Sequence, residues 1–272
     1  MAISEQVELL GKGLYKDIPD TLTLSNIPTA SELDYVGSED FDRTMLETIL
    51  PQAIKENIDF KQLLEIDFQW LCRCLRIMNY GPYHTTNAIF CDKCGRTSYG
   101  EFRVNLNTIG CKTLPDGFIN DIVIPKEEFI EFDGDVHIKL PTIQDMLNAS
   151  KDKAFQNAAG RTNTELARIC YMISSLGNKS KMTPVEIKMS IQKNFSAADY
   201  TILRSKVSEL TDYGLRAGGS AQCPKCGSTS AAFVALVDDR FFRPTVGDLQ
   251  QWKHDRSGRD SKDVPGDKTT AV

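Results

Sequence analysis

The sequence lacks the features that mark several large classes of protein. Its 272 residues carry 32 Lys and Arg against 37 Asp and Glu, a formal net charge of −5. Nucleic-acid binders usually need a basic surplus or stripe to neutralise phosphates, so this balance argues against that class. No stretch reaches the roughly 18 consecutive apolar residues of a transmembrane helix, so we expect no membrane span. The start MAISEQVELLGKG also lacks the basic and apolar regions of a secretory signal.

Catalytic signatures are missing as well. The sequence has no G-x-S-x-G, H-E-x-x-H, P-loop or G-x-G-x-x-G motif. The three histidines, His84, His137 and His254, are scattered along the chain. The acidic residues between positions 127 and 135 lack the ligand spacing of a calcium loop and fit a solvated turn better. We therefore expect no catalytic residues, no residues that bind an organic cofactor, and no enzyme activity.

The composition that remains is that of an ordinary globular protein. Hydrophobic residues make up 41% and charged residues 25%, enough for a core that needs no metal or disulfide. Alternating helical and extended patterns predict an α+β fold in four parts. These are a mainly helical N-terminal region (1–84), a split β region (85–102 plus 218–240) whose two C-x-x-C pairs are typical of a zinc ribbon, an insertion of strands followed by helices (103–217), and a short helix with a polar tail (241–272).

Helical periodicity is clearest before the first cysteine pair. Residues 38–50 are apolar at helical spacing until Pro51, which interrupts or restarts the helix. Residues 59–81 place Phe68, Leu71, Leu75 and Met78 on one face, as in a well-buried helix that Gly81 ends. Short strands are expected at 21–27, 121–125 and 136–141.

Capping signals predict the helices of the insertion and of the C-terminal region. Thr142, Thr183 and Ser196 each precede an acidic residue by three positions, the pattern of a capping box. A further helix starts near Thr164 and runs through ELARICYMISSLG to Gly177. Thr245 caps a short helix up to residue 252, and residues 253–272 have too few apolar side chains to order on their own.

The eight cysteines contain the clearest chemical signal. In a reducing cytosol they are thiols or metal ligands rather than disulfides. Two segments share the form C-x-K-C-G, at 91–95 and 223–227, and each leads into a β run. Two cysteines two residues apart supply two thiolates from one tight turn, and zinc takes four in a tetrahedron. The sequence therefore predicts one structural Zn²⁺ per chain, held by Cys91, Cys94, Cys223 and Cys226.

The spacing of these pairs leaves other interpretations open. A compact site has about 15–20 residues between its pairs, whereas here the gap exceeds a hundred, so the two turns could be unrelated. A redox C-x-x-C is another possibility, although it would open a helix. His84 could replace a ligand. Cys74 and Cys170 fit core positions, and Cys111 fits a buried thiol in a loop. The favoured interpretation is a ribbon divided by a large insertion.

One composite pattern resembles a known family. Residues 65–95 read as D-F-x-x-L-x-x-x-L-R, a helix-ending Gly and a hairpin with C-x-x-C-G, which is similar to the baseplate hub subunit family of T4-type contractile-tailed phages. The matching positions are Asp67, Phe68, Leu71, Leu75, Arg76, Gly81, Cys91, Cys94 and Gly95. The large insertion and the late second pair depart from that pattern.

The resemblance implies a structural or assembly protein of the phage tail baseplate. Its partners would be other tail and baseplate proteins in a multi-protein assembly, and it would be made in the host bacterial cytoplasm and located in the virion. The alternative is a zinc-ribbon module that binds nucleic acid or assists transcription. That alternative predicts basic residues around the two C-x-K-C-G segments at 91–95 and 223–227, which we call the knuckles. The sequence offers few such residues: Lys93, Arg96, Arg103, Arg216, Lys225 and Arg240.

Overall fold

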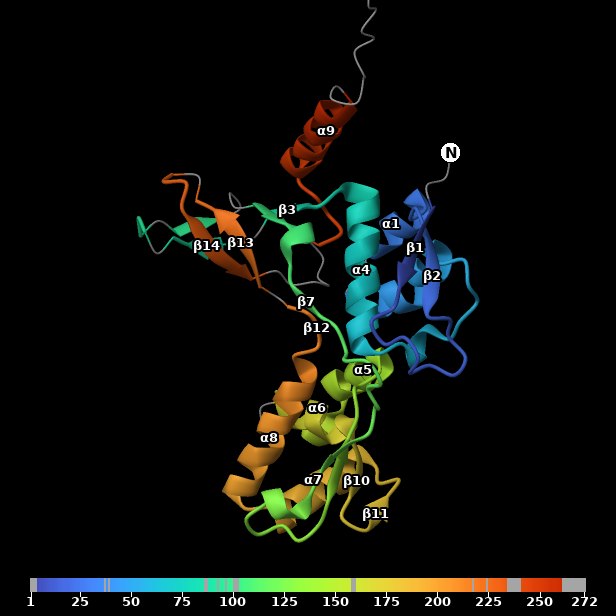
Figure 1. The fold of residues 1–272 in the computed structure, drawn as a ribbon, viewed down its shortest axis with the longest axis vertical. Helices are drawn as coiled ribbons and strands as arrows, with labels where there is room; N and C mark the ends of the chain where they lie inside the picture. The colour runs from blue at the N-terminus through green and yellow to red at the C-terminus, as the bar shows by residue number, and fades with distance from the viewer. Residues whose placement is uncertain are drawn as a thin grey trace, which may run out of the picture. The chain divides into compact units, whose positions relative to one another are not determined.

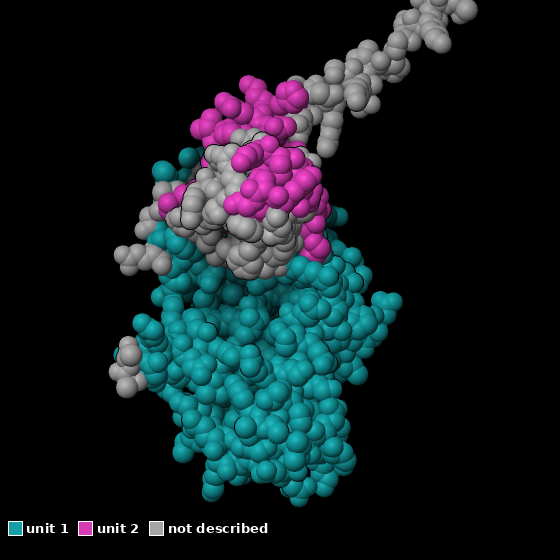
Figure 2. Space-filling view, turned by 90° about the vertical axis from the view of Figure 1, so that its left-hand side faces the viewer, with its two compact units in different colours: residues 1–72, 111–216 teal, residues 73–110, 217–272 magenta. Residues whose placement is uncertain are grey.

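The computed structural model describes residues 4–36, 38, 40–85, 88–91, 93–95, 97–99, 103–157, 160–216, 218–223, 225–233 and 241–260. Its helices and small antiparallel sheets form a mixed α+β fold, as predicted. The chain divides into two compact units, each built from two segments (Figure 2): residues 1–72 with 111–216 are unit 1, and residues 73–110 with 217–272 are unit 2. This division groups the four predicted regions differently, and the four-part scheme stays a prediction.

Unit 1 begins with a hairpin and a series of helices (Figure 1). Strand β1 (Ser4–Glu8) pairs antiparallel with β2 (Thr21–Ser25), which lies inside the predicted strand. After α1 (Thr29–Val36), one continuous helical run contains α2 (Phe41–Thr44), the π-helical η1 (Met45–Ile49) and α3 (Leu50–Ala53). The 3₁₀ turn η2 (Phe60–Gln62) precedes the next helix.

At Pro51 the helical run restarts, one of the two predicted outcomes: Pro51 lies in the first turn of α3, directly after the π-helical segment. Proline lacks an N–H and its ring crowds the preceding turn of an α-helix. Directly before it the backbone widens to π geometry, and the Leu50 N–H donates to the Met45 carbonyl five residues back. Such a π-bulge gives the ring room inside an otherwise helical segment, which the apolar periodicity alone did not indicate.

The long helix α4 (Glu65–Tyr80) has most of the predicted buried face. Phe68, Leu71 and Leu75 are at most 1% exposed, whereas Met78, in the last turn, is half-buried. The boundary between the two units falls after Cys72, so the first half of α4 belongs to unit 1 and the second half to unit 2.

The insertion supplies the rest of unit 1. Its sheet has the antiparallel order β11-β10-β9-β8, and α6 packs against α5, α7 and α8; Figure 1 labels β10, β11 and these four helices. The core between them includes Ile124, Val136, Ile138, Ile169, Met172, Ile187 and Leu203. The elements are β7 (Cys111–Lys112), β8 (Ile122–Ile124), η4 (Lys126–Glu128), β9 (Val136–Ile138), α5 (Ile143–Lys151), η5 (Lys153–Phe155), α6 (Thr164–Met172), β10 (Ile173–Leu176), β11 (Lys179–Ser180), α7 (Pro184–Asn194), α8 (Ala197–Thr211) and β12 (Gly214–Leu215).

The predicted caps are confirmed at three of these helices. Thr142, Thr183 and Ser196 each form a reciprocal capping box with the acidic residue three positions on. The predicted helix up to Gly177 is wrong in its second half, because α6 ends at Met172 and the chain continues as β10. β10 completes a sheet with β9, and this long-range pairing overrides the local helical pattern.

Unit 2 consists of the second half of α4, a set of short strands and the helix α9. One sheet has the order β14-β13-β6-β3, and a separate hairpin joins β4 to β5. The elements are β3 (Tyr83–Thr85), β4 (Ala88–Phe90), β5 (Thr97–Tyr99), β6 (Arg103–Asn105), η3 (Leu106–Thr108), β13 (Gly218–Gln222), β14 (Thr229–Phe233) and α9 (Val246–Asp260).

Helix α9 is longer than predicted. Thr245 caps it, with the Asp248 N–H donating to Thr245 Oγ1 at 3.1 Å and the Thr245 N–H donating to Asp248 Oδ2 at 3.0 Å. The Trp252 ring lies against Gly81, where an added Cβ would come within 2.4 Å of it. Cap and tryptophan together anchor the helix, so the predicted disorder is wrong for residues 253–260. Residues 261–272 of the predicted tail lie outside the described residues.

A buried arginine organises the same unit. The Arg76 guanidinium is fully buried and donates to the carbonyls of Phe241, Gly81 and Tyr83 at 2.5, 2.7 and 2.7 Å. Burial lowers its pKa to about 10, and the carboxylate of Asp248 offsets part of that effect. Arg76 therefore connects the end of α4 to two segments that are far apart in the sequence.

Candidate metal centre

The two C-x-K-C-G segments fold into matching turns at the ends of β-hairpins in unit 2. The first joins β4 to β5 and the second joins β13 to β14. In each, the glycine N–H donates to the carbonyl of the first cysteine at 2.8 Å. Gly95 has φ +66 and Gly227 has φ +69, a left-handed conformation that favours glycine. The shared sequence therefore produces the same local backbone twice.

These turns bring the four predicted cysteine sulfurs together. All four Sγ atoms lie within 4.8 Å of one another. Across the two turns, Cys91 Sγ is 3.6 Å from Cys226 Sγ, and Cys94 Sγ is 3.8 Å from Cys223 Sγ. Cys91 and Cys223 are buried, and Cys94 and Cys226 are half-buried. The group is large enough and close enough to hold a metal ion.

Hydrogen bonds around the sulfurs favour the thiolate form. Ser228 Oγ lies 3.2 Å from Cys91 Sγ and 3.0 Å from Cys226 Sγ. The Ser228 hydroxyl and the backbone N–H groups of Cys94 and Lys93 lower the pKa of Cys91 to about 5. Ser228 also lowers the pKa of Cys226. Two of the four thiols are thus prepared to bind a cation, since the thiolate is the metal ligand.

The wide gap between the cysteine pairs is spanned by a segment whose ends lie side by side. Within unit 1, β7 pairs with β12, and Cys111 lies opposite Leu215. Within unit 2, β6 pairs with β13 through Val104 and Ala221. The chain therefore leaves the ribbon after β6 and returns to it at β13. This pairing explains how a ribbon tolerates an insertion of this length.

The remaining cysteines and the histidines lie elsewhere. Within the described residues, the four knuckle cysteines are the one cluster of three or more potential metal ligands. His84 is buried and packs against Phe241 with ring centroids 5.6 Å apart. Cys170 is buried as predicted, but Cys72 rather than Cys74 is the buried member of its pair, and Cys111 is exposed rather than buried. Two side chains at positions i and i+2 of a helix point to different sides, so only one of Cys72 and Cys74 can face the core. The apolar periodicity indicated Cys74, and the buried one is Cys72.

The C-x-K-C-G motif alone did not identify Ser228 as part of the site. A hydroxyl residue directly after the second knuckle's glycine could have indicated a hydrogen-bond donor to the ligands, because a side chain there can turn back toward the thiolates. At the corresponding place in the first knuckle the sequence has Arg96, so the two halves of the site differ here.

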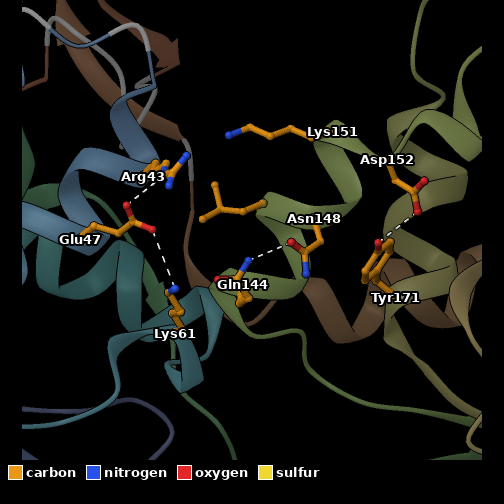
Figure 3. A pocket seen from close by; sticks show the side chains of 9 residues that line it. Arg43, Glu47, Lys61, Gln144, Asn148, Lys151, Asp152 and Tyr171 are labelled. Atoms are coloured by element: carbon orange, nitrogen blue, oxygen red, sulfur yellow. Dashed lines mark hydrogen bonds and ion pairs between the residues drawn. The ribbon is translucent and has the colours of Figure 1, made fainter.

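A polar pocket in unit 1, with a cavity volume of about 440 Å³, is a second concave site (Figure 3). Its charged lining residues are already partnered. Glu47 pairs with Arg43 at 2.9 Å and with Lys61 at 3.9 Å, Lys151 pairs with Asp40, and Asp152 accepts from Tyr171 at 3.1 Å. The remaining lining residues include Gln144 and Asn148, which bond to each other. This mutual compensation is typical of a hydrated surface cleft.

Comparisons with known proteins place no further constraint on the site. Among the helices of the described residues, none combines the length and apolar character needed to cross a bilayer. No protein-family model, no curated protein and no solved structure matches the chain.

Proposed function

We propose that the four cysteines hold a structural Zn²⁺ ion. The supporting observation is the distance between sulfurs. Thiolates lie about 2.3 Å from zinc, and a tetrahedron of that radius has edges of about 3.8 Å. Two of the four sulfur pairs that cross between the knuckles, Cys91–Cys226 and Cys94–Cys223, are 3.6 and 3.8 Å apart, and all four sulfurs lie within 4.8 Å of one another. Four thiolates fill the coordination sphere, so the ion ties the two hairpins together and has no open position for catalysis.

Metal analysis tests this proposal directly. Purified full-length protein should contain one zinc per chain, and iron is the competing result because the same tetrathiolate geometry also suits it. Cys223→Ser should lose most of the metal. Cys111→Ser is the matched control, because Cys111 is an exposed thiol outside the cluster, and it should keep the full metal content. A Cys223→Ser protein that retains one zinc would rule out the shared site.

We further propose that the chain is a structural subunit of a contractile phage tail baseplate, in its hub region, and is located in the virion. The support is the sequence resemblance of residues 65–95. In the structure those positions are packing and connecting positions: Phe68, Leu71 and Leu75 are core, and Arg76 and Gly81 join the helix to its neighbours. A tetrathiolate zinc suits this role, because it would rigidify a binding surface without adding chemistry.

Co-purification tests the assembly role. Affinity-tagged protein expressed during infection should carry baseplate or tail proteins with it, and mass spectrometry of purified tails should detect the chain. If purified tails lack it and no tail protein accompanies it, the assembly proposal fails while the zinc proposal stands.

Binding to nucleic acid is a second candidate, and the distribution of charge favours it. Unit 2 carries 13 Lys and Arg against 9 Asp and Glu, a net charge of +4, whereas unit 1 carries 19 against 28, a net charge of −9. Four thiolates around a divalent ion would bring unit 2 down to about +2, a weak basis for phosphate binding. A mobility shift on DNA or RNA that weakens with salt would support this candidate against the assembly role.

A further inference from the structure

Ser228 occupies a position between the two halves of the metal centre. Its Oγ lies 3.0 Å from the sulfur of Cys226 on its own knuckle and 3.2 Å from the sulfur of Cys91 on the other knuckle. Its backbone is held in place, because the Ser228 carbonyl accepts from the Cys223 N–H at 2.8 Å. The side chain is half-buried. A fixed backbone and two sulfur neighbours leave the hydroxyl little freedom.

The chemistry of the group fixes the direction of these hydrogen bonds. A metal-bound thiolate carries no proton and acts only as an acceptor, so the hydroxyl must donate. A serine has one proton to donate, which the two sulfurs share. Donation withdraws electron density from sulfur, which makes the thiolate less basic and less reactive toward electrophiles. Partners of this kind orient metal ligands and tune the metal.

We propose that Ser228 is a positioning residue that protects one cross-knuckle pair of ligands, Cys91 and Cys226, from electrophilic attack. The inference rests on the proposed metal centre. It predicts an asymmetric site, because the corresponding position of the first knuckle is Arg96 and supplies no hydroxyl. Cys91 and Cys226 therefore depend on Ser228 in a way that Cys94 and Cys223 do not.

Site-resolved alkylation of the full-length zinc-loaded protein provides the main test. Iodoacetamide labelling followed by peptide mass spectrometry measures the rate at each cysteine separately. Ser228→Ala should speed alkylation of Cys91 and Cys226 about tenfold, the lower end of the 10–100-fold loss of metal affinity or activity that removal of such a hydrogen-bond partner causes. Cys94 and Cys223 should change much less. A general loosening of the fold would instead speed all four equally, which would overturn the proposal.

Two further variants and a spectroscopic measurement complete the test. Ser228→Thr keeps the hydroxyl and should restore slow alkylation, and Thr229→Ala removes an exposed hydroxyl next along the chain and should behave as wild type. With Co²⁺ in place of zinc, the sulfur-to-cobalt absorption should shift to longer wavelength in Ser228→Ala, because the sulfur lone pairs rise in energy. Wild-type protein that binds neither Zn²⁺ nor Co²⁺ would overturn the metal centre itself. Normal metal binding with unchanged rates and spectra in Ser228→Ala would overturn the role of Ser228 alone.

Discussion

Removing the proposed metal should destabilise unit 2 and leave the stability of unit 1 unchanged. The magnitude follows from the length of chain that the metal would close. If the whole chain unfolded at once, the cross-link between Cys94 and Cys223 would close a loop of 129 residues, worth about 5 kcal/mol of chain entropy. With unit 1 folded, however, the pairing of Cys111 with Leu215 bridges the insertion.

The effective loop is then much shorter. Cys111 follows Cys94 by 17 positions and Cys223 follows Leu215 by 8, about 25 in all, close to the spacing in a compact ribbon. A cross-link over that length is worth about 3.5 kcal/mol. Chelation or Cys223→Ser should therefore lower the free energy of unfolding of unit 2 by at least this amount, before the lost metal–sulfur interactions are counted.

The two tryptophans allow each unit to be followed alone. Trp70 lies in unit 1, where its Nε1 donates to the Glu8 carbonyl at 3.1 Å, and Trp252 lies in unit 2 against Gly81. Single-tryptophan variants, Trp70→Phe and Trp252→Phe, would then report on unit 2 and unit 1 respectively. With a urea m-value of about 1.5 kcal/mol/M for a unit of this size, 3.5 kcal/mol corresponds to a shift of about 2 M in the midpoint.

The expected result is a lower midpoint for Trp252 after chelation, an unchanged midpoint for Trp70, and a far-UV signal that keeps most of its helical amplitude. If both tryptophans shifted together, the units would not unfold separately and the argument from a shortened loop would be wrong. If neither shifted, the cysteine cluster would not contribute to the stability of unit 2.

Three further perturbations test the packing within the two units. Burial raises the pKa of Asp199, but hydrogen bonds from the backbone N–H groups of residues 130, 131 and 196 more than offset this effect and lower the pKa to about 2. The stability that the carboxylate contributes should therefore be complete above pH 4 and disappear as the pH falls toward 2. In thermal melts at a series of pH values, Asp199→Asn should flatten this acid limb. Gly81→Ala should destabilise unit 2 by about 2–4 kcal/mol, because the new Cβ meets both a backbone φ of +79 and the Trp252 ring. Gly117→Ala is the control: Gly117 has φ +73 with open space around it, so the substitution should cost only about 1–2 kcal/mol. Equal losses of stability in urea unfolding would contradict the collision with Trp252. Arg76→Met should cost about 3–5 kcal/mol by leaving three carbonyls without their donor, and a near-neutral result by the Trp252 signal would exclude a structural role for the guanidinium.

The sequence allowed the four cysteine ligands to be predicted because each of the two turns is determined locally and the turns match, although their meeting depends on long-range pairing such as that of β6 with β13. A C-x-K-C-G turn needs only its own backbone and a left-handed glycine, and the two copies match. The capping boxes at Thr142, Thr183 and Ser196 were predictable for the same reason. In contrast, β10 and the π turn before Pro51 depend on partners far along the chain or on a compensation between neighbouring turns, and hydrophobic periodicity carries neither kind of information.

Helix α4 shows why the family resemblance and the function need separate tests. The two charged residues of the resembling pattern, Asp67 and Arg76, are both buried. Each forms hydrogen bonds to backbone groups near a different end of the helix. Asp67 accepts from the N–H of Gly11 at 3.2 Å in unit 1, and Arg76 donates to the carbonyls that follow the helix in unit 2. A D-F-x-x-L-x-x-x-L-R pattern is thus what any helix would need to be fixed in this way at both ends. The pattern therefore reports on how α4 is held, and the proposed place of the protein in a baseplate depends on the partners that co-purify with it.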